Sequence, residues 1–314
     1  MKKILVTGGA GFLGSNLCRE LIKDKNNYVY CLDNLYTGKL ENIEELMNNK
    51  NFEFIRDDVR TFDIDKIQVD EIYNAACPAS VPAYQNDPFL TSETCYIGMK
   101  NMLEMARKNN AKILQFSTSE IYGNPLVHPQ VEEYFGNTTT IGPRACYDEG
   151  KRIAETLCFD YKRQFDTKIK VVRIFNTYGP HMYKYDGRVV SNFIIQALEN
   201  KDITIYGDGN QTRSFCYVDD LIDGIIKMMA TDDNITGPMN LGNPHEFTVK
   251  QLAELVLQKV DTNSKLIFED LPQDDPIKRQ PNIEKAKNTL NWAPKIELES
   301  GIEKTIEYFK NIWK

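Results

Sequence analysis

The sequence predicts an α/β protein in which a doubly wound parallel sheet is joined to a smaller C-terminal cap. Short apolar runs typical of strands alternate with helical patterns through residues 1–178, as expected for a parallel sheet covered by helices on both faces. A glycine-rich turn at 8–14 connects the first apolar run to a helical pattern. After Gly179 and Pro180 the alternation weakens, and helical stretches are separated by loops rich in Gly, Pro and Asp.

Each predicted element follows from its apolar pattern. Residues 2–7 form a short β-type run that ends in glycines, and apolar residues then recur at helical spacing over 12–23. The later runs predict five more strands at 28–32, 52–56, 71–75, 113–117 and 170–174, and helices at 92–108 and 147–165.

The C-terminal part is predicted to form a cap. Because no Pro/Ser linker separates the cap from the sheet domain, we expect the cap to pack directly on the sheet. Its helical patterns cover 189–199, 219–229, 249–259 and 299–309. We expect residues 1–178 to form the sheet domain, with 214–245 returning to it, and 179–213 and 246–314 to form the cap.

Composition excludes several classes of protein. The 314 residues are 41% hydrophobic, so a full core is expected. The net charge of −7 provides no basic surface for a phosphate backbone, so nucleic acid is not expected as a partner. The seven Cys are scattered without CxxC spacing, and the three His lack metal-ligand spacing, so neither a disulfide framework nor a metal site is expected. No run approaches the ~20 apolar residues that span a bilayer. These features favour a cytoplasmic protein without membrane partners.

The glycine turn predicts a dinucleotide site. Gly9, Gly11 and Gly14 match G-x-G-x-x-G, and Gly8 adds the wider spacing with Gly11 and Gly14, between a strand and a helix. Glycines there let the backbone approach a pyrophosphate, whose charge is stabilised by the N–H groups at the start of the helix. The sequence thus favours a Rossmann-type fold over a merely tight turn.

Asp33, at the end of the second strand, favours NAD as the coenzyme. It lies ~20 residues after the glycines, where a carboxylate accepts hydrogen bonds from ribose hydroxyls and repels a 2′-phosphate. Asn34 follows it rather than Arg or Lys. Asp58 follows another strand and either caps the adenine amino group or is an exposed loop acid. The expected coenzyme contacts are Gly8, Gly11, Phe12, Leu13, Gly14, Asp33, Asn34, Thr37, Gly38, Asp58, Val59, Ala75, Tyr147, Lys151, Thr177 and Arg188.

Tyr147 and Lys151 are the candidate chemical groups. Their i, i+4 spacing places both side chains on one helix face, where an ammonium is expected to lower the tyrosine pKa from ~10 and make the phenol a usable base. The hydroxyls of 117–119 and the acid Glu120 follow the fifth predicted strand, and parallel sheets bind ligands at the carboxyl ends of strands. By itself, a Tyr and Lys at this spacing is usually an ordinary surface pair.

These motifs resemble the extended short-chain dehydrogenases/reductases, the NAD-dependent epimerase/dehydratase family, over essentially the whole chain. Within that family the sequence most resembles UDP-glucuronate decarboxylases, also called UDP-xylose synthases. The segments that carry the resemblance are Pro-Ala-Ser at 78–80, Ser-Thr-Ser-Glu-Ile-Tyr-Gly at 117–123, Val-His-Pro-Gln at 127–130, and the longer segments 141–152, 186–193 and 273–279.

The resemblance implies roles for the site residues. Tyr147 would take the proton from the sugar O4 while a hydride leaves C4 for NAD, and Lys151 would also hold the nicotinamide ribose. The 4-ketone formed lies β to the C6 carboxylate, so carbon dioxide can leave. Catalytic positions implied in this way are Tyr147, Lys151, Glu120, Ser119, Thr118 and Arg279; substrate-binding positions are Pro78, Ser80, Arg144, Asn176, Asn192, Tyr206, Arg213 and Arg279. As bare residues, Arg213 and Arg279 would more often be surface charges.

Alternative functions follow from the same resemblance. Nucleotide-glucose 4,6-dehydratases usually carry Thr-Asp-Glu where this chain has Thr118, Ser119 and Glu120, and the hydroxyl of Ser119 cannot replace the acid. The 4-epimerases usually lack the acid at the position of Glu120. A non-catalytic NAD-sensing scaffold is a further alternative, disfavoured by the retention of Tyr147, Lys151 and Glu120. The family also implies a homodimer that pairs the helices at 92–108 and 147–165.

Two positions depart from the family pattern. Cys95 stands where an Asn usually steadies the backbone of the active site, and Cys77 replaces the usual Ser before Pro-Ala-Ser. A relative with altered sugar specificity is consistent with these changes. Cys146 precedes Tyr147 and is expected to be structural, because neighbouring residues on a helix point in different directions.

Overall fold

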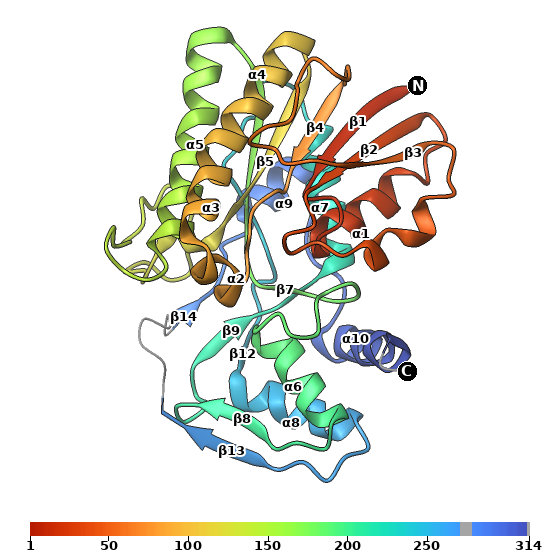
Figure 1. The fold of residues 1–314 in the computed structure, drawn as a ribbon. Coiled ribbons are helices and arrows are strands. Elements are labelled where there is room, and N and C mark those ends of the chain that lie inside the picture. Colours follow the sequence, from red (N-terminus) through yellow and green to blue (C-terminus); the bar gives the residue numbers. More distant parts are fainter. Residues whose placement is uncertain (271–277, 313–314) are drawn as a thin grey trace.

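A computed structural model describes residues 1–270 and 278–312 of the chain (Figure 1). Of the predicted motif at 273–279, residues 273–277 lie outside the described residues. The elements up to the end of the predicted sheet domain are β1 (Lys2–Thr7), α1 (Phe12–Leu21), β2 (Asn27–Asp33), η1 (Leu40–Asn42), η2 (Glu44–Leu46), β3 (Phe52–Arg56), β4 (Glu71–Asn74), α2 (Val81–Asn86), α3 (Pro88–Glu93), the π-helical turn η3 (Thr94–Gly98), α4 (Met99–Asn109), β5 (Lys112–Thr118), η4 (Ser119–Tyr122), α5 (Ala145–Phe165), β6 (Lys168–Ile174) and β7 (Thr177–Tyr178).

Short strands and helices alternate in the rest of the described chain. These elements are α6 (Val189–Leu198), β8 (Ile203–Tyr206), β9 (Thr212–Ser214), β10 (Cys216–Tyr217), α7 (Val218–Met229), β11 (Met239–Leu241), β12 (Glu246–Thr248), α8 (Val249–Lys259), β13 (Leu266–Glu269), β14 (Lys278–Arg279), α9 (Glu284–Leu290) and α10 (Leu298–Ile312).

The central sheet of the described chain has the order β11-β6-β5-β4-β1-β2-β3, and every neighbouring pair is parallel. The predicted doubly wound parallel sheet is therefore confirmed. The strand order reverses between β1 and β4, and ligands bind outside the carboxyl ends of the strands at such a switch point. The sequence pattern missed β11, which has only three residues and pairs with β6.

Alternating side chains of β1 belong to two separate cores. In β1, Ile4 and Val6 pack into one core with Leu17 of α1, whereas Leu5 packs into the other. The second core includes Leu103 of α4 and Cys158 of α5. Helices α4 and α5 thus cover one face of the sheet, and α1 and α7 cover the other (Figure 1). Burial on both faces explains the nearly continuous apolar runs of these strands.

The smaller part lies beyond the carboxyl ends of the central strands (Figure 1). It contains the pairs β10-β7 and β13-β8 and the three-stranded arrangement β12-β9-β14, with α6, α8 and α10 packed on one another. Helix α9 instead contacts α7 and β11 of the sheet domain. The loops expected between the C-terminal helices therefore contain short strands, which are fixed by pairing with distant segments rather than by a local pattern.

Helix boundaries differ from the predicted ones at the site. Helix α5 begins at Ala145, so Tyr147 lies in its first turn rather than at its start. The helix expected at 92–108 begins earlier, at Pro88, and its middle is the π-helical turn of η3. Such turns are frequent at functional sites because they re-aim the side chains that follow. In the described part of the chain, no helix combines the length and apolar character needed to cross a membrane.

Candidate active site

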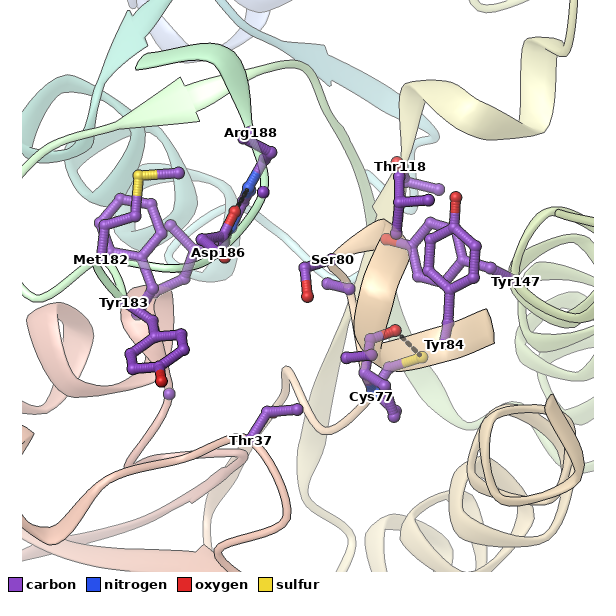
Figure 2. A pocket seen from close by; sticks show the side chains of 18 of the residues that line it. Thr37, Cys77, Ser80, Tyr84, Thr118, Tyr147, Met182, Tyr183, Asp186 and Arg188 are labelled. Carbon is purple, nitrogen blue, oxygen red and sulfur yellow. Dashed lines mark hydrogen bonds and ion pairs between the residues drawn. The ribbon is translucent and has the colours of Figure 1, made fainter. Parts of the chain in front are cut away.

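A cavity of about 1280 Å³ lies between the carboxyl ends of the central strands and the smaller part of the protein (Figure 2). Its volume exceeds the roughly 300–1,000 Å³ of a pocket for one small ligand, and it leaves room for a dinucleotide beside a second ligand. Among the expected site residues only Gly38 does not line it. Those that do are Gly8, Gly11, Phe12, Leu13, Gly14, Asp33, Asn34, Thr37, Asp58, Val59, Ala75, Pro78, Ser80, Thr118, Ser119, Glu120, Arg144, Tyr147, Lys151, Asn176, Thr177, Arg188, Asn192, Tyr206, Arg213 and Arg279.

The glycine turn requires glycine for steric reasons. Gly8 has φ +65°, and a Cβ on Gly14 would lie 2.1 Å from the carbonyl oxygen of Gly8. Gly11 is the N-cap of α1 and provides no side-chain cap, and the first turn of α1 has no acidic residue. The N–H groups at this helix start are therefore available to an anionic ligand, which suits a pyrophosphate.

Asp33 lies beside this turn at the end of β2. Its Oδ2 accepts a hydrogen bond from the Ala10 N–H at 3.0 Å and its Oδ1 one from the Leu35 N–H at 2.7 Å. Burial raises the pKa of Asp33, and these two hydrogen bonds oppose the shift. A Cβ on Gly38 would lie 2.7 Å from Asp33 Oδ1, so Gly38 shapes the cavity by its contact with Asp33 although it does not line it.

Asp58 accepts more hydrogen bonds from protein groups than Asp33 does. Arg60 donates to both of its carboxylate oxygens at 3.0 and 2.9 Å, and Asn34 Nδ2 donates to Oδ2 at 2.9 Å. Burial would raise the pKa of Asp58, but the hydrogen bonds from Arg60 and Asn34 outweigh it and lower that pKa. Asp58 is therefore not a free loop acid, and its contact with the adenine amino group stays a prediction.

Replacing Asp33 by Asn is expected to weaken NAD binding about 10- to 100-fold, the range of a hydrogen bond to a charged group. The amide keeps one acceptor oxygen but places an NH₂ group opposite a backbone N–H donor of Ala10 or Leu35. Titration calorimetry with NAD gives the affinity. Asp58→Asn is the matched control and should cost less, because Arg60 occupies its carboxylate. Equal affinities of Asp33→Asn and the unmodified protein would contradict the assignment.

Tyr147 and Lys151 are both buried in the first two turns of α5, with exposures of 6% and 4%. Lys151 Nζ donates to the Phe116 carbonyl at 2.9 Å and lies 5.7 Å from the centre of the Tyr147 ring. The ring of Tyr84, from α2, stacks on Tyr147 with centres 5.0 Å apart and planes 8° apart. Figure 2 shows the two rings together beside Thr118.

The sequence predicted that the pKa of Tyr147 is lowered, and this prediction is wrong: the protein groups around Tyr147 together raise its pKa. Burial raises the pKa of Tyr147 well above 10, the nearby charges of Cys77 and Glu120 add to the rise, and a hydrogen bond with Thr118 opposes it. The ammonium of Lys151 is held by a backbone carbonyl rather than by the phenol. Burial therefore opposes ionisation of the Tyr147 phenol.

A cluster of charges brings together residues far apart in the sequence. Arg279, which is 2% exposed, donates from Nη1 to Glu120 Oε1 at 2.7 Å and to Ser119 Oγ at 3.1 Å. Its Nη2 donates to the Gly123 carbonyl at 2.9 Å. Arg144 Nη2 binds the other oxygen of Glu120 at 2.6 Å. Burial would raise the pKa of Glu120, but the charges of Arg279 and Arg144 outweigh it and lower that pKa.

Pairing between β14 and β9 brings Arg279 to this place. The two strands are parallel, with Arg279 opposite Arg213, another expected site residue. The Nε of Arg279 is buried and has no hydrogen-bond partner among the described residues. A buried donor without a partner costs free energy, and a ligand oxygen would satisfy it.

Asp148, next to Tyr147, was not identified from the sequence. Burial and the charge of Glu120 raise its pKa to about 7, although Arg144 opposes the shift. Its Oδ1 is buried and has no hydrogen-bond partner among the described residues. No local pattern distinguishes Asp148 from an ordinary helix-start acid, because the shift comes from tertiary neighbours.

Asp148→Asn is expected to stabilise the protein at pH 8 but not at pH 4. The unfolded chain releases this proton near pH ~3.9 and the folded protein only near 7. Native stability therefore falls as the pH rises between these values, on the order of a few kcal/mol in total, and the amide removes that loss. Thermal unfolding at both pH values measures the difference. Asp160→Asn, on the same helix and half exposed beside Arg163, is the control and should show no gain. Equal shifts for the two variants would contradict the argument.

The wall of the cavity opposite Tyr147 contains residues that were only partly predicted from sequence motifs. Figure 2 shows Asp186, Arg188, Met182 and Tyr183 across from Tyr147. Arg188 forms an ion pair with Asp186, and its guanidinium lies 5.9 Å from the centre of the Phe12 ring. Tyr84 and Tyr183 were missed because the sequence around each has no chemical motif. Only the fold brings them to the cavity.

Comparison with known proteins agrees with this geometry. The family model for GDP-mannose 4,6 dehydratase matches residues 5–305. UDP-glucuronic acid decarboxylase 1 of Xenopus tropicalis is 49% identical over 309 residues, covering 98% of this chain and 72% of the relative. UDP-glucuronic acid decarboxylase 6 of Arabidopsis thaliana is 50% identical over 308 residues, covering 98% of this chain and 89% of the relative.

A solved structure shares the whole architecture. The UDP-glucuronic acid 4-epimerase of Bacillus cereus, in complex with UDP-glucuronic acid and NAD, superposes with a TM-score of 0.90 at 30% identity, over 99% of both chains. The sheet order, the glycine turn and these matches lead to one conclusion: the chain belongs to the GDP-mannose 4,6-dehydratase family of NAD-dependent epimerases and dehydratases.

Proposed function

We propose that the protein is an NAD-dependent UDP-glucuronate decarboxylase, a carboxy-lyase that oxidises the sugar at C4, releases carbon dioxide and yields UDP-xylose. The observation that carries the proposal is the charge cluster at the end of β5. There two guanidinium groups, of Arg144 and Arg279, bind the single carboxylate of Glu120. Two guanidinium groups at one place favour a sugar that carries a carboxylate, the group that a planar guanidinium fork binds well. The relatives named UDP-glucuronic acid decarboxylase, at 49–50% identity, support the same reaction.

NAD fits the residues present. The glycine turn and the start of α1 would hold its pyrophosphate, Asp33 its adenosine ribose, and Lys151 its nicotinamide ribose. When bound, NAD would accept a hydride from C4 of the sugar and return it at the end of the cycle. Its positive charge would also oppose the burial that raises the pKa of Tyr147.

The chain's own groups would then handle protons and the carboxylate. Tyr147 takes the proton of O4 as the C4 hydride leaves, and these two losses together create a ketone β to the C6 carboxylate. Arg279 and Arg144 hold this carboxylate, and the buried Nε of Arg279 supplies a donor without a protein partner among the described residues. After carbon dioxide leaves, the electron pair rests on the ketone oxygen as an enolate, and C5 then takes up a proton from water beside Ser119 and Glu120.

Dehydration is the closest alternative reaction, and Ser119 disfavours it. Losing the C6 hydroxyl of a glucose requires an acid on that side of the sugar, and a serine hydroxyl is a poor proton donor to a leaving group. Ser119 also accepts a hydrogen bond from Arg279 at 3.1 Å, which joins it to the proposed carboxylate site.

Product analysis tests the proposal. The purified protein is incubated with NAD and UDP-glucuronate, and in parallel with dTDP-glucose. We expect carbon dioxide and a UDP-pentose from the first reaction and no product from the second. A 4-keto-6-deoxy sugar from dTDP-glucose would show dehydration instead. A second UDP-hexuronate without carbon dioxide would show epimerisation.

We further propose that residues 1–178 and 214–245 hold NAD, and that 179–213 and 246–314 hold the nucleotide-sugar. The diphosphate and nucleoside would contact Asn176, Asn192, Arg213 and Tyr206, all of which line the cavity. The free cysteines suit a reducing compartment such as the cytoplasm.

A homodimer through the helices at 92–108 and 147–165 is part of the proposal. Large apolar side chains are exposed on or next to these helices, and such residues on a surface often mark an interface. They are Phe89, Tyr96, Ile97, Ile153 and Phe165. Light scattering of the purified protein should give twice the mass of the chain, and a replacement of Tyr96 by Glu should lower it to one chain.

A further inference from the structure

Two cysteines lie side by side at the edge of the cavity. Cys77 follows β4 and lines the cavity, and Cys95 belongs to the π-helical turn η3. Their Sγ atoms are 3.4 Å apart, and both thiols are free. These are also the two positions at which the sequence departs from its family. The fold therefore builds a dithiol where the family pattern has none.

Neighbouring groups hold the pair in place. A Cβ on Gly150 of α5 would lie 3.0 Å from Cys95 Sγ, so α5 packs tightly against the buried thiol, which is 3% exposed. Cys77 Sγ is 3.4 Å from the carbonyl oxygen of Pro78, the contact drawn in Figure 2. Little motion separates the two sulfurs from bonding distance, because a disulfide needs about 2.05 Å between them.

The two thiols differ chemically in the way a redox pair requires. A hydrogen bond between Cys77 and Cys95 and the charge of Lys151 lower the pKa of Cys77 to about 7, against the effect of burial. The hydrogen bond with Cys77 and burial raise the pKa of Cys95 well above its ordinary value. The two shifts have opposite directions, so Cys77, which lines the cavity, ionises more readily than Cys95, which is buried behind it. A thiolate is the form that attacks oxidants.

We propose that Cys77 and Cys95 form a reversible redox site, which hydrogen peroxide converts to a disulfide that lowers turnover. The Cys77 thiolate attacks one oxygen of hydrogen peroxide and becomes a sulfenic acid, the O–O bond breaks, and the hydroxide that leaves takes up one proton to become water. Cys95 sulfur then attacks the Cys77 sulfur, and its proton leaves with the sulfenic hydroxyl as a second water. Two thiols lose two electrons in total, and the peroxide gains them. A small dithiol reductant reverses the process by thiol–disulfide exchange.

The disulfide would change the geometry beside Tyr147. Closing the sulfur separation from 3.4 Å to about 2.05 Å shifts the sulfurs by roughly 1 Å and draws the Cys77 thiol, which lines the cavity, toward Cys95. A misplacement of about 1 Å near reacting groups costs up to 10²-fold in rate. We expect at least a tenfold loss of turnover. This loss rests on the proposed function, but formation of the disulfide does not.

The chain offers a direct chemical readout. Trypsin cuts after Lys66 and Lys100 and nowhere between them, so the peptide 67–100 contains Cys77 and Cys95 and no other cysteine. The full-length protein is treated with hydrogen peroxide, alkylated without reduction, digested and weighed. The reduced peptide carries two alkyl groups. The disulfide form carries none and weighs two hydrogens less.

Two serine variants locate the site. Cys146→Ser is the matched control, because Cys146 also lies beside Tyr147 but its Sγ contacts the Tyr84 carbonyl at 3.5 Å. We expect the unmodified protein and Cys146→Ser to form the disulfide and to recover both thiols with dithiothreitol. Cys95→Ser should never lose the two hydrogens, and Cys95→Ala repeats this test if the serine variant does not fold.

Each outcome bears on the proposal. Formation of the disulfide together with a reversible loss of UDP-pentose production supports it. If both thiols of peptide 67–100 remain open to alkylation while Cys146 is oxidised, no redox site exists. Formation of the disulfide with unchanged turnover would also overturn it. In a protein without decarboxylase activity, the mass of the peptide still tests the dithiol and separates its failure from that of the proposed function.

Discussion

Tyr147→Phe is expected to reduce turnover about 10³-fold while leaving NAD binding intact. The substitution removes only the phenolic oxygen, the proposed acceptor of the O4 proton, and general acid–base groups contribute roughly 10²–10⁴-fold. The ring stays stacked on Tyr84, so the helix and the cavity wall are preserved. The measurement is the rate of carbon dioxide release with saturating NAD and UDP-glucuronate, together with the NAD affinity from calorimetry.

Tyr84→Phe is the matched control for this result. It removes a hydroxyl from the partner ring, and that hydroxyl is buried without a hydrogen-bond partner among the described residues. The loss of activity should be far smaller, within about tenfold, since no proton transfer is assigned to it. Equal effects of the two substitutions would contradict the role of Tyr147. Absence of turnover in both the unmodified protein and Tyr147→Phe, with NAD binding retained, would favour a scaffold that senses NAD.

Arg279→Lys should lower kcat/KM for UDP-glucuronate about 10²-fold. Lysine keeps the charge but loses the planar fork that reaches Ser119, Glu120 and the Gly123 carbonyl together. We expect binding of UDP-glucose, which lacks the carboxylate, to change little. Steady-state kinetics with UDP-glucuronate and competition by UDP-glucose separate these effects.

Arg173→Lys controls for the loss of a buried arginine. Arg173 makes a forked ion pair with Glu155 at 3.0 and 2.8 Å and does not line the cavity. Both arginine variants should lower the thermal midpoint, because each weakens a buried ion pair. Only Arg279→Lys should lower kcat/KM by 10²-fold. A similar loss in both would show that Arg279 acts through stability alone.

Long apolar patterns allowed most of the sheet to be predicted. The strands at 2–7 and 52–56 match β1 and β3 in both bounds, and the helix at 249–259 matches α8. Burial on both faces makes such runs visible in the sequence. The strands β11 and β14 have three and two residues, too few for any periodicity, and pairing with distant strands defines them.

The candidate site could be predicted where its residues belong to a recognisable sequence motif. Tyr147, Lys151 and Glu120 lie in recognisable segments and line one cavity. The electrostatics were not predictable, since the raised pKa of Tyr147 and of Asp148 depends on burial and on charges from other elements. The contact between Cys77 and Cys95 was equally hidden. It depends on how the loop after β4 meets the π-helical turn η3.

The central claim is that Tyr147 deprotonates O4 while the C4 hydride is transferred to NAD and later returned. UDP-glucuronate labelled with deuterium at C4 tests this claim most directly. Because the hydride stays in the closed site, the UDP-pentose product should keep the label at C4, with one carbon dioxide per turnover and a slower rate than the unlabelled sugar. A UDP-pentose that has lost the C4 deuterium to water, or formed equally fast by Tyr147→Phe, would contradict it.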